Sequence, residues 1–385
     1  MIDIEQFTHN LARWLHTNNY VGYDPYQLQL MKLWPLLNIM TSPRLPNFFL
    51  NKSFMPRLLD MAIKQNKKLL IPKALGLVIR GNVSMFKKTK QSSLLPQNEN
   101  LIQTLMDNRY PSYNNPAWGV PFSWKSGFGW FYPEAYPAAI VTAEIGHAFL
   151  DHYDIKPSQQ LKTICCGIAE ALIDEIGVTQ IDEQQVCFHY TDLDKYFVIN
   201  VHTYAASYLA RLYSVVPDKK YYELALAAIK FTLSHQQDNG SWYYYAPPFV
   251  KMNKRIDNRH TGFTLVSLLW ANKVLNQNDI TEAVQKGWKF YRQNFVSEYM
   301  PKWSMDSLFP IDMHDVAQLV ITSAEFGDLE LARGCAQWAI DKMSNNKDEF
   351  YYRMYRNGTV IKIPFIRWNQ AWMYRALTLL LEKTE

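Results

Sequence analysis

The sequence predicts an all-α fold, an (α/α)6 toroid in which six helical hairpins close into a ring, with short strand-like pieces in the loops at one end. Three observations lead to this prediction. A unit of about 55 residues recurs along the chain from residue 116 onward. Each unit pairs a half-polar helical segment with one that is apolar on nearly every side. The apolar helix of each unit begins at a cluster of polar residues.

The polar clusters mark the repeat most clearly. They occupy residues 136–139, 199–203, 257–261, 311–315 and 367–371. Within them, intervals of 58, 54 and 55 residues separate His202, His260, His314 and Asn369. Repeats of this length stack on their neighbours and bury one continuous core. We therefore expect these four positions to be equivalent in the ring and to line one pocket.

The segments between the clusters follow two helical patterns. Amphipathic stretches, each with one apolar stripe, cover residues 159–176, 219–237, 280–295 and 328–344. The stretches that follow the clusters, such as 264–271 and 317–322, are apolar nearly all round, which predicts burial on every side. Aromatic, strand-like pieces precede the clusters at residues 120–124, 186–190, 240–244, 301–304 and 350–353. Each unit is thus expected to hold a half-exposed outer helix and a buried inner helix.

The repeat predicts that residues 1–385 form a single toroid domain. Residues 116–385 carry the clear repeats, and residues 1–115 are expected to supply less regular hairpins. Helices are predicted at 54–66 and 101–109, and residues 22–26 resemble a further polar opening ahead of a helix. A repeat architecture explains how one domain can reach this length.

Composition excludes several classes of protein. The 40 basic and 35 acidic residues give a net charge of +5, and the excess is scattered along the chain. Nucleic-acid-binding proteins usually concentrate basic residues on one face, so no nucleic-acid partner is expected. Aromatic residues are unusually common at 15%. Tyr and Trp combine an apolar face with a polar tip, which suits sugar binding as well as core packing.

The expected location is the cytoplasm. Residues 1–5 include two acids and no basic segment followed by an apolar run, so no secretory signal is expected. No apolar run approaches the roughly 20 residues that a transmembrane helix needs. The four cysteines lack metal-ligand spacing and fit a reducing compartment.

The polar clusters have two possible purposes, capping and chemistry. Asp257, Asp312 and Asn200 stand where an N-cap residue would bond the free N–H groups of a helix. The recurrence of His beside them is harder to explain by capping, because three equivalent histidines in a ring would converge on one space. We therefore expect a functional role for at least two of His202, His260 and His314.

Three kinds of chemistry remain open for the pocket. The three histidines with a carboxylate would suit zinc, although no pair has the tight spacing of a metal motif. Paired carboxylates would suit cleavage of a glycosidic bond, with candidates at Asp192, Asp194, Asp257, Asp306, Asp312, Asp315, Glu134 and Glu144. A His or Tyr base, with Arg or Asn to neutralise a carboxylate, would suit proton abstraction from an acidic sugar.

The third chemistry gives the predicted site. The catalytic candidates are His260, His314, His202, Asp257, Asp312 and Asp315. The substrate-binding candidates are Arg259, Asn258, Asn200, Tyr204, Arg367, Asn369, Gln370, Trp124, Trp242, Trp303, Trp368 and Asp24. No metal or other cofactor is expected, because the chain has no nucleotide-binding, redox or metal motif.

Residues 257–263, 309–318 and 367–373 together resemble a group of bacterial proteins encoded in capsule, exopolysaccharide and O-antigen gene clusters. Residues 22–26 and 188–190 also match that pattern, so the resemblance covers most of the chain. More broadly, the plan is similar to (α/α)6-barrel carbohydrate enzymes: unsaturated-glucuronyl hydrolases, N-acylglucosamine 2-epimerases and glucuronyl C5-epimerases. Residues 369–372 resemble the Gly-Gln-Ala-Trp of the hydrolases, with Asn369 in place of Gly, but the hydrolases' catalytic aspartates have no counterpart here.

The resemblance implies a carbohydrate-active enzyme of surface-polysaccharide biosynthesis. Its partner would be an oligosaccharide, a polysaccharide or a lipid-linked sugar intermediate. Together with the residues of the predicted site, it favours an epimerase or lyase that acts on a uronate-type sugar. A glycoside hydrolase and a non-catalytic polysaccharide-binding or assembly protein are the alternatives.

Overall fold

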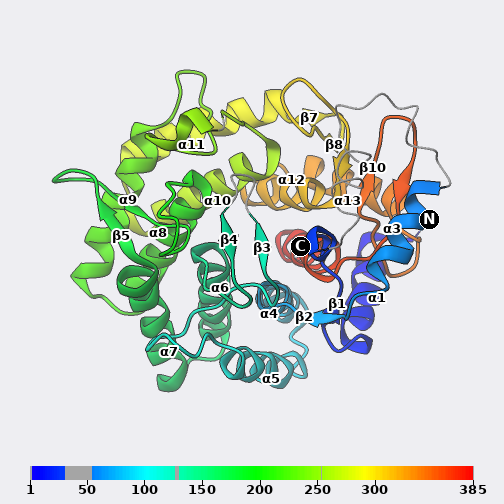
Figure 1. The fold of residues 1–385 in the computed structure, drawn as a ribbon, viewed down its shortest axis with the longest axis horizontal. Coiled ribbons are helices and arrows are strands. Elements are labelled where there is room, and N and C mark those ends of the chain that lie inside the picture. Colours follow the sequence, from blue (N-terminus) through cyan, green and yellow to red (C-terminus); the bar gives the residue numbers. More distant parts are fainter. Residues whose placement is uncertain (1, 31–53, 126–129, 253, 385) are drawn as a thin grey trace. The chain divides into compact units, whose positions relative to one another are not determined.

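The structure, a computed structural model, describes residues 2–30, 54–125, 130–252 and 254–384. These residues form two compact units, each made of separate stretches of the chain. Unit 1 comprises residues 1–90, 121–134 and 295–385, and unit 2 comprises residues 91–120 and 135–294. Helices dominate both units (Figure 1), as the sequence predicts.

Unit 2 alternates buried and half-exposed helices along the chain. The buried helices are α6 (Ala139–Ile155), α8 (Ile199–Tyr213) and α10 (Asn258–Leu275). The half-exposed helices are α5 (Leu94–Asp107), α7 (Gln159–Glu170), α9 (Lys219–Ser234) and α11 (Asn278–Asn294). Helix α8 packs against both α6 and α10, while α7, α9 and α11 each pack on the buried helix that precedes them.

The burial of α8 and α9 follows from their sequences. Every residue from 199 to 210 in α8 is buried, because this helix is covered on all sides. Helix α9 buries a stripe that includes Tyr221, Ala225 and Ala228 and leaves its polar face exposed. The predicted pairing of an inner and an outer helix is therefore confirmed.

Short elements connect the helices of unit 2. A π-helical segment, η3 (Ala171–Gly177), leads into the antiparallel strands β5 (Val178–Gln180) and β6 (Val186–Phe188). Residues 240–244, predicted as strand-like, form no strand; they follow a turn at residues 237–240 and lead to an isolated bridge between Val198 and Tyr245. The turn needs Gly240, whose φ is +95° and whose added Cβ would lie 2.6 Å from the Lys286 carbonyl oxygen. The single-turn helix η4 (Phe249–Met252) follows.

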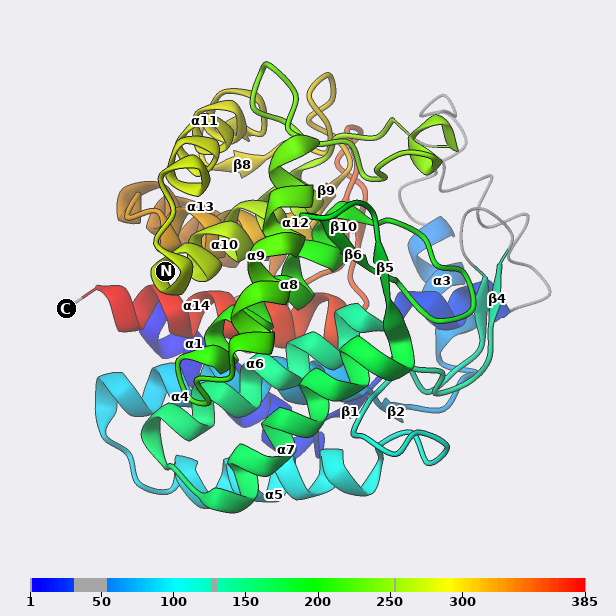
Figure 2. The same ribbon diagram turned by 90° about the vertical axis from the view of Figure 1, so that its left-hand side faces the viewer.

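Unit 1 is built around buried α14 (Trp372–Lys383), which packs against α4 (Pro72–Thr89) and α12 (Met313–Glu325). Figure 2 shows α14 running alongside α4. The outer helices α1 (Ile4–Thr17) and α13 (Leu329–Met343) cover this core. The shorter helices are η1 (Pro25–Leu30), α3 (Phe54–Ile63) and the π-helical η5 (Ile366–Ala371), which continues into α14.

The strands of unit 1 are short and antiparallel. They pair as β1 (Val21–Gly22) with β2 (Leu69–Leu70), β3 (Trp124–Lys125) with β4 (Phe131–Tyr132), and β7 (Val296–Ser297) with β8 (Met300–Pro301). A three-stranded sheet has the order β11 (Val360–Ile361), β10 (Arg353–Met354), β9 (Ile311–Asp312). Its register places Arg353 opposite Asp312, directly before α12.

The N-terminal region differs from the prediction in one main respect. The helices expected at 54–66 and 101–109 are present as α3 and α5, but α4 was not predicted. Polar residues such as Lys73, Arg80 and Asn82 hide its apolar pattern, although all three are buried. The opening at 22–26 leads into η1, and residues 31–53 beyond it lie outside the described residues.

Candidate functional site

A pocket in unit 2 lies at the N-terminal turns of α8 and α10. Its lining residues are Ile199, Asn200, Trp242, Tyr243, Tyr244, Arg255, Asp257, His260, Thr261 and Thr264. The sequence-predicted residues Asn200, Trp242, Asp257 and His260 are therefore brought together here. The pocket is small, and its lining combines aromatic walls with convergent polar groups.

Asp257 and His260 form a hydrogen-bonded pair in the pocket. Asp257 caps α10, and its Oδ1 accepts the backbone N–H of His260 at 3.0 Å. The ring Nδ1 of His260 lies 2.8 Å from Oδ1 and 2.7 Å from Oδ2 of the same carboxylate. Since an ionised carboxylate can only accept, Nδ1 carries the proton and Nε2 is left with its lone pair. The imidazole is thus oriented as a base.

The charges around the pair keep this arrangement at neutral pH. Burial favours a raised pKa for Asp257, but His260 and the Arg255 guanidinium, whose Nε lies 2.5 Å from Oδ2, hold that pKa well below its usual range. Burial lowers the pKa of His260, against the opposing pull of Asp257. Asp257 is therefore ionised and His260 neutral near pH 7.

Asn200 supplies a second polar group to the pocket. It is 5% exposed, and its Oδ1 has no hydrogen-bond partner among the described residues. A buried amide oxygen without a partner is costly unless a ligand satisfies it. Asn200 is thus suited to accept a hydrogen bond from a bound hydroxyl group.

Aromatic side chains form the remaining wall. The indole N–H of Trp242 donates to the Thr232 carbonyl at 2.9 Å, which fixes the ring orientation. The Tyr244 ring stands edge-on to His260, with centroids 4.6 Å apart. Tyr244 and Trp242 therefore hold the imidazole and the pocket wall in place, since edge-on aromatic contacts are favourable.

A second polar cluster, in unit 1, surrounds Asp312. This fully buried carboxylate accepts hydrogen bonds from Arg353 Nε at 3.0 Å and Nη2 at 2.5 Å, and from the Trp368 indole at 2.7 Å. It also caps α12 by accepting the N–H of His314 at 3.0 Å. The His314 ring stacks on Trp372 at 4.8 Å and meets Trp368 edge-on at 4.8 Å.

The cations of this cluster lie against aromatic rings. The Arg353 guanidinium is 5.2 Å from the Trp303 ring centroid and 4.6 Å from that of Tyr352. Burial opposes its charge, but Tyr352 and Asp312 raise the pKa of Arg353 well above its ordinary value. Lys73, which the sequence reasoning missed, lies with its ammonium 5.3 Å from the Trp372 ring centroid. Lys73 is buried in the first turn of α4, and no local sequence pattern indicates that burial.

Arg367 and Asp24 form a buried ion pair in unit 1. The guanidinium donates from Nε at 2.7 Å and from Nη2 at 2.9 Å. It also lies 5.2 Å from the Tyr26 ring centroid and 5.1 Å from that of Trp368. This two-pronged pair ties the loop before η1 to η5.

Several predicted residues hold the backbone. Both ring nitrogens of fully buried His202 bond to backbone: Nδ1 accepts the Phe188 N–H at 3.0 Å, and Nε2 donates to the Ala228 carbonyl at 2.8 Å. Gln370 bonds the N–H and carbonyl of Phe350, and Asn369 donates to the carbonyls of Phe350 and Ile363. These contacts fix strands and loops against the buried helices.

Other predicted residues also lie in buried surroundings. Asn258 accepts from the Tyr291 hydroxyl at 2.9 Å, and the Tyr204 hydroxyl donates to Glu144 at 3.0 Å. Arg259 is buried in the first turn of α10 and contributes to the low pKa of Asp257. Asp315 is buried in α12. The functional roles predicted for these residues stay predictions.

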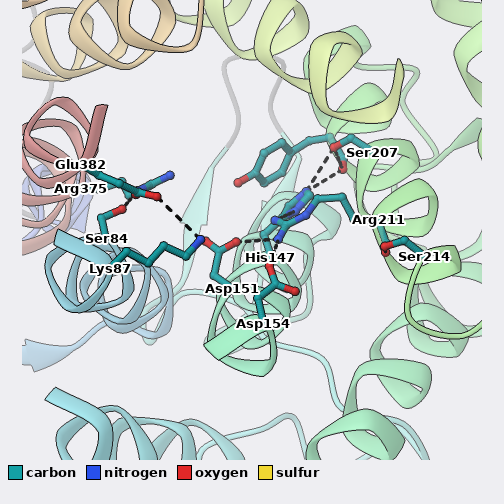
Figure 3. Close-up of polar contacts among 11 residues, drawn as sticks. Ser84, Lys87, His147, Asp151, Asp154, Ser207, Arg211, Ser214, Arg375 and Glu382 are labelled. Atoms are coloured by element: carbon teal, nitrogen blue, oxygen red, sulfur yellow. Dashed lines mark hydrogen bonds and ion pairs between the residues drawn. The ribbon is translucent and has the colours of Figure 1, made fainter. Parts of the chain in front are cut away.

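His147 of unit 2 is held in a polar network (Figure 3). Its Nδ1 accepts from Arg211 Nη1 at 3.0 Å, so Nε2 carries the proton and lies 3.2 Å from the Ser207 hydroxyl. Arg211 in turn pairs with Asp151 at 2.6 Å. Both ring nitrogens of His147 are therefore engaged, in contrast to the pocket-lining His260.

Neither a cluster of metal-ligating side chains nor a membrane-spanning helix is found among the described residues. Within residues 2–30, 54–125, 130–252 and 254–384, no three His, Cys, Asp or Glu side chains are grouped as a metal site requires. Over the same residues, no helix has both the length and the apolar character to cross a bilayer.

Comparison with known proteins shows the fold. The chain matches no protein-family model and no curated protein by sequence. Its structure is similar to cellobiose 2-epimerase from Bacillus thermoamylovorans, with 10% identity over 82% of this chain and 88% of the other and a TM-score of 0.64. It is also similar to a polysaccharide lyase, with 12% identity over 81% and 89% of the chains and a TM-score of 0.57.

A third similar structure is a glycoside hydrolase family 76 mannosidase from Bacteroides thetaiotaomicron, with 13% identity over 81% and 87% of the chains and a TM-score of 0.54. The chain has the (α/α)6-toroid fold. The fold class predicted from the repeat is thereby confirmed. Because one fold hosts many chemistries, the reaction has to be argued from the site.

Proposed function

We propose that the protein is a carbohydrate-active enzyme that moves a proton on an acidic, uronate-type sugar, as an epimerase or a lyase. The Asp257–His260 pair carries this proposal. A buried carboxylate fixes one nitrogen of the imidazole, and the other nitrogen belongs to a ring that lines an aromatic-walled pocket. That arrangement is the usual way to prepare a general base.

In the proposed step, His260 Nε2 takes the proton from the sugar carbon next to the carboxylate or carbonyl group. The electron pair of the broken C–H bond moves into that group and forms an enolate. Return of a proton from a water molecule to the opposite face gives the epimer, and His260 releases its own proton to solvent. Alternatively, the electron pair forms a carbon–carbon double bond while the neighbouring C–O bond breaks, and the departing oxygen takes up the proton that His260 removed, directly or through water, which is the lyase outcome.

The remaining pocket residues fit this substrate. The Arg255 guanidinium lines the pocket and would balance the negative charge that grows on the sugar. Asn200 would accept a hydrogen bond from a sugar hydroxyl, and Trp242 with Tyr243 would contact the apolar face of the ring.

The electrostatics of Asp257 disfavour the hydrolase alternative. Cleavage of a glycosidic bond needs a carboxylic acid with a raised pKa beside a second carboxylate. The pKa of Asp257 is held well below its usual range, and Asp257 is the sole carboxylate among the described residues that line this pocket. Proton abstraction by His260 requires neither feature.

The biological setting of the proposal is surface-polysaccharide assembly in the cytoplasm. It is supported by the resemblance of residues 257–263, 309–318 and 367–373 to proteins of capsule and O-antigen clusters. The substrate would then be an oligosaccharide, a polysaccharide or a lipid-linked intermediate with a uronate residue.

Deuterium uptake tests the reaction. The full chain is incubated in deuterated water with short oligosaccharides of galacturonate, mannuronate and glucuronate. Deuterium at carbon 5 indicates epimerisation, and new ultraviolet absorbance indicates a double bond. His260→Gln should lower the rate at least about 100-fold. His9→Gln, the same change at a 43%-exposed histidine of α1, should leave it unchanged. Cleavage with neither deuterium nor double bond would refute the proposal in favour of hydrolysis.

A further inference from the structure

Two side chains share one oxygen of the buried Asp257 carboxylate. The Arg255 Nε lies 2.5 Å from Oδ2, and the His260 Nδ1 lies 2.7 Å from the same oxygen. The other oxygen, Oδ1, accepts the backbone N–H of His260 at 3.0 Å. The Asp257 side chain is 2% exposed, whereas that of Arg255 is 38% exposed. A guanidinium and an imidazole therefore meet at one carboxylate that is almost out of contact with water.

Backbone contacts hold Arg255 beside this pair. The Tyr244 N–H donates to the Arg255 carbonyl at 2.9 Å, and the Tyr244 ring stands edge-on to His260. Asp257 follows Arg255 by two residues and caps α10. The three side chains are thus brought together by the chain path, as well as by their mutual attraction.

The buried carboxylate needs one positive partner, because an uncompensated buried charge is strongly unfavourable. Two groups are placed to supply it: Arg255, which is always charged, and His260, which must first bind a proton. If His260 supplied the charge, its Nε2 would carry a proton and could not take one from a substrate. Arg255 therefore spares the imidazole from acting as the counter-ion.

The other groups around the imidazole leave this division of roles unchanged. Burial lowers the pKa of His260, Asp257 raises it, and Arg255 and Arg259 lower it further. Within the described lining, the remaining residues are uncharged near neutral pH: Ile199, Asn200, Trp242, Tyr243, Tyr244, Thr261 and Thr264. None of these comes from α9 or α11, which also pack on α10. Asp257 is thus the group that favours a proton on His260, and Arg255 is its direct partner.

We propose that Arg255 is a positioning residue for the base: it serves as the counter-ion of Asp257, so that His260 stays neutral and keeps the Nε2 lone pair near neutral pH. The inference rests on the proposed function, in which His260 is the base, and it gives Arg255 a role that needs no contact with the sugar. Without the guanidinium, His260 becomes the counter-ion and holds a proton at the pH where the reaction needs Nε2 unprotonated.

The experiment is an NMR titration of the full chain, isotope-labelled at histidine, from pH 4.5 to 8.5. The His260 signal is assigned by its absence from His260→Gln. Arg255→Met should raise the titration midpoint of His260 by about one pH unit or more. Arg255→Lys keeps a charge and should shift the midpoint by less than half as much. The control is Arg109→Met, the same change at an exposed arginine that follows α5, and it should leave the midpoint unchanged.

Urea unfolding gives a second readout, which also covers a variant that folds poorly at neutral pH. Because a proton on His260 replaces the missing cation, the urea midpoint of Arg255→Met should be closest to that of the wild type at pH 5.5. It should fall further below the wild-type value as the pH rises to 8. The sign follows because the pKa of His260 is the higher one in the variant, so the compensating proton is lost as the pH rises.

Three results would overturn the inference: an unchanged or lowered His260 midpoint in Arg255→Met, an equal shift in Arg109→Met, or a urea deficit that does not depend on pH. Deuterium uptake is measured separately on the same proteins. Uptake by the wild type with an unmoved midpoint in Arg255→Met removes the role of Arg255 alone. A raised midpoint without uptake on any sugar removes the proposed reaction and leaves Arg255 as the counter-ion that keeps His260 neutral.

Discussion

Protonation of His202 is expected to destabilise the fold in mildly acidic solution. The imidazole is fully buried in α8, where it accepts the Phe188 N–H and donates to the Ala228 carbonyl. A second ring proton would displace the accepted bond and place a charge in apolar surroundings. Burial therefore lowers the pKa of His202 to about 4, although the Ala228 carbonyl opposes the shift.

The magnitude follows from proton linkage. An unfolded histidine has a pKa of about 6.5. Between pH 6.5 and 4, His202 is therefore protonated in the unfolded chain but largely unprotonated in the native state. Because the folded-state pKa is the lower one, this contribution to stability is fully present above pH 6.5 and is lost as the pH falls. The loss for His202 is about 2 kcal/mol at pH 5 and about 3 kcal/mol at pH 4.

The assay is urea unfolding followed by Trp fluorescence at pH 7.5, 6, 5 and 4, for the wild type and His202→Gln. Glutamine does not titrate, and at Gln370 this chain already uses that side chain to bond the N–H and carbonyl of Phe350. The wild type should lose about 2 kcal/mol more than the variant between pH 7.5 and 5. Parallel pH dependences of the two proteins would refute the reasoning.

Three further outcomes are expected. Because burial lowers the pKa of His260, the rate of deuterium uptake should reach half its maximum at a pH below 6.5; a half-maximal rate above pH 6.5 would contradict this. Asp257→Asn should lower uptake at least about 100-fold and move that acidic limb to lower pH, since Asp257 raises the pKa of His260; an unchanged profile would argue against the pair. Arg353→Met should lower the free energy of unfolding in urea by about 3–5 kcal/mol, because buried Asp312 loses its counter-charge. Lys219→Met, at an exposed ion pair, should change that free energy little.

Much of the fold could be predicted because its determinants are local. The alternation of α8 and α9 is visible as two apolar patterns, one continuous and one striped. Helix α4 was not predicted in this way, because Lys73 and Arg80 are buried by tertiary contacts that a local sequence pattern does not show. The apolar patterns thus predict the helices whose buried faces are apolar. They miss α4, whose buried residues include charged side chains.

The candidate site could be predicted less well, because equal spacing in sequence is not equal phase on a helix. His202 is the fourth residue of α8, His260 the third of α10 and His314 the second of α12. Each residue turns the helix by about 100°. The three side chains therefore leave their helices in different directions: His202 reaches backbone atoms, His260 lines the pocket, and His314 stacks on Trp372.

The same difference in phase explains why capping and chemistry coincide at one aspartate. In a capping box the third helical residue reaches back to the N-cap. His260 occupies that third position, so one carboxylate of Asp257 satisfies both its backbone N–H and its ring Nδ1. His314 follows its N-cap Asp312 one residue sooner, and the Asp312 carboxylate caps the helix while binding Arg353 and Trp368. Both aspartates cap a helix. At α10 the capping carboxylate also orients His260 as a base, whereas at α12 it forms a buried ion pair with Arg353.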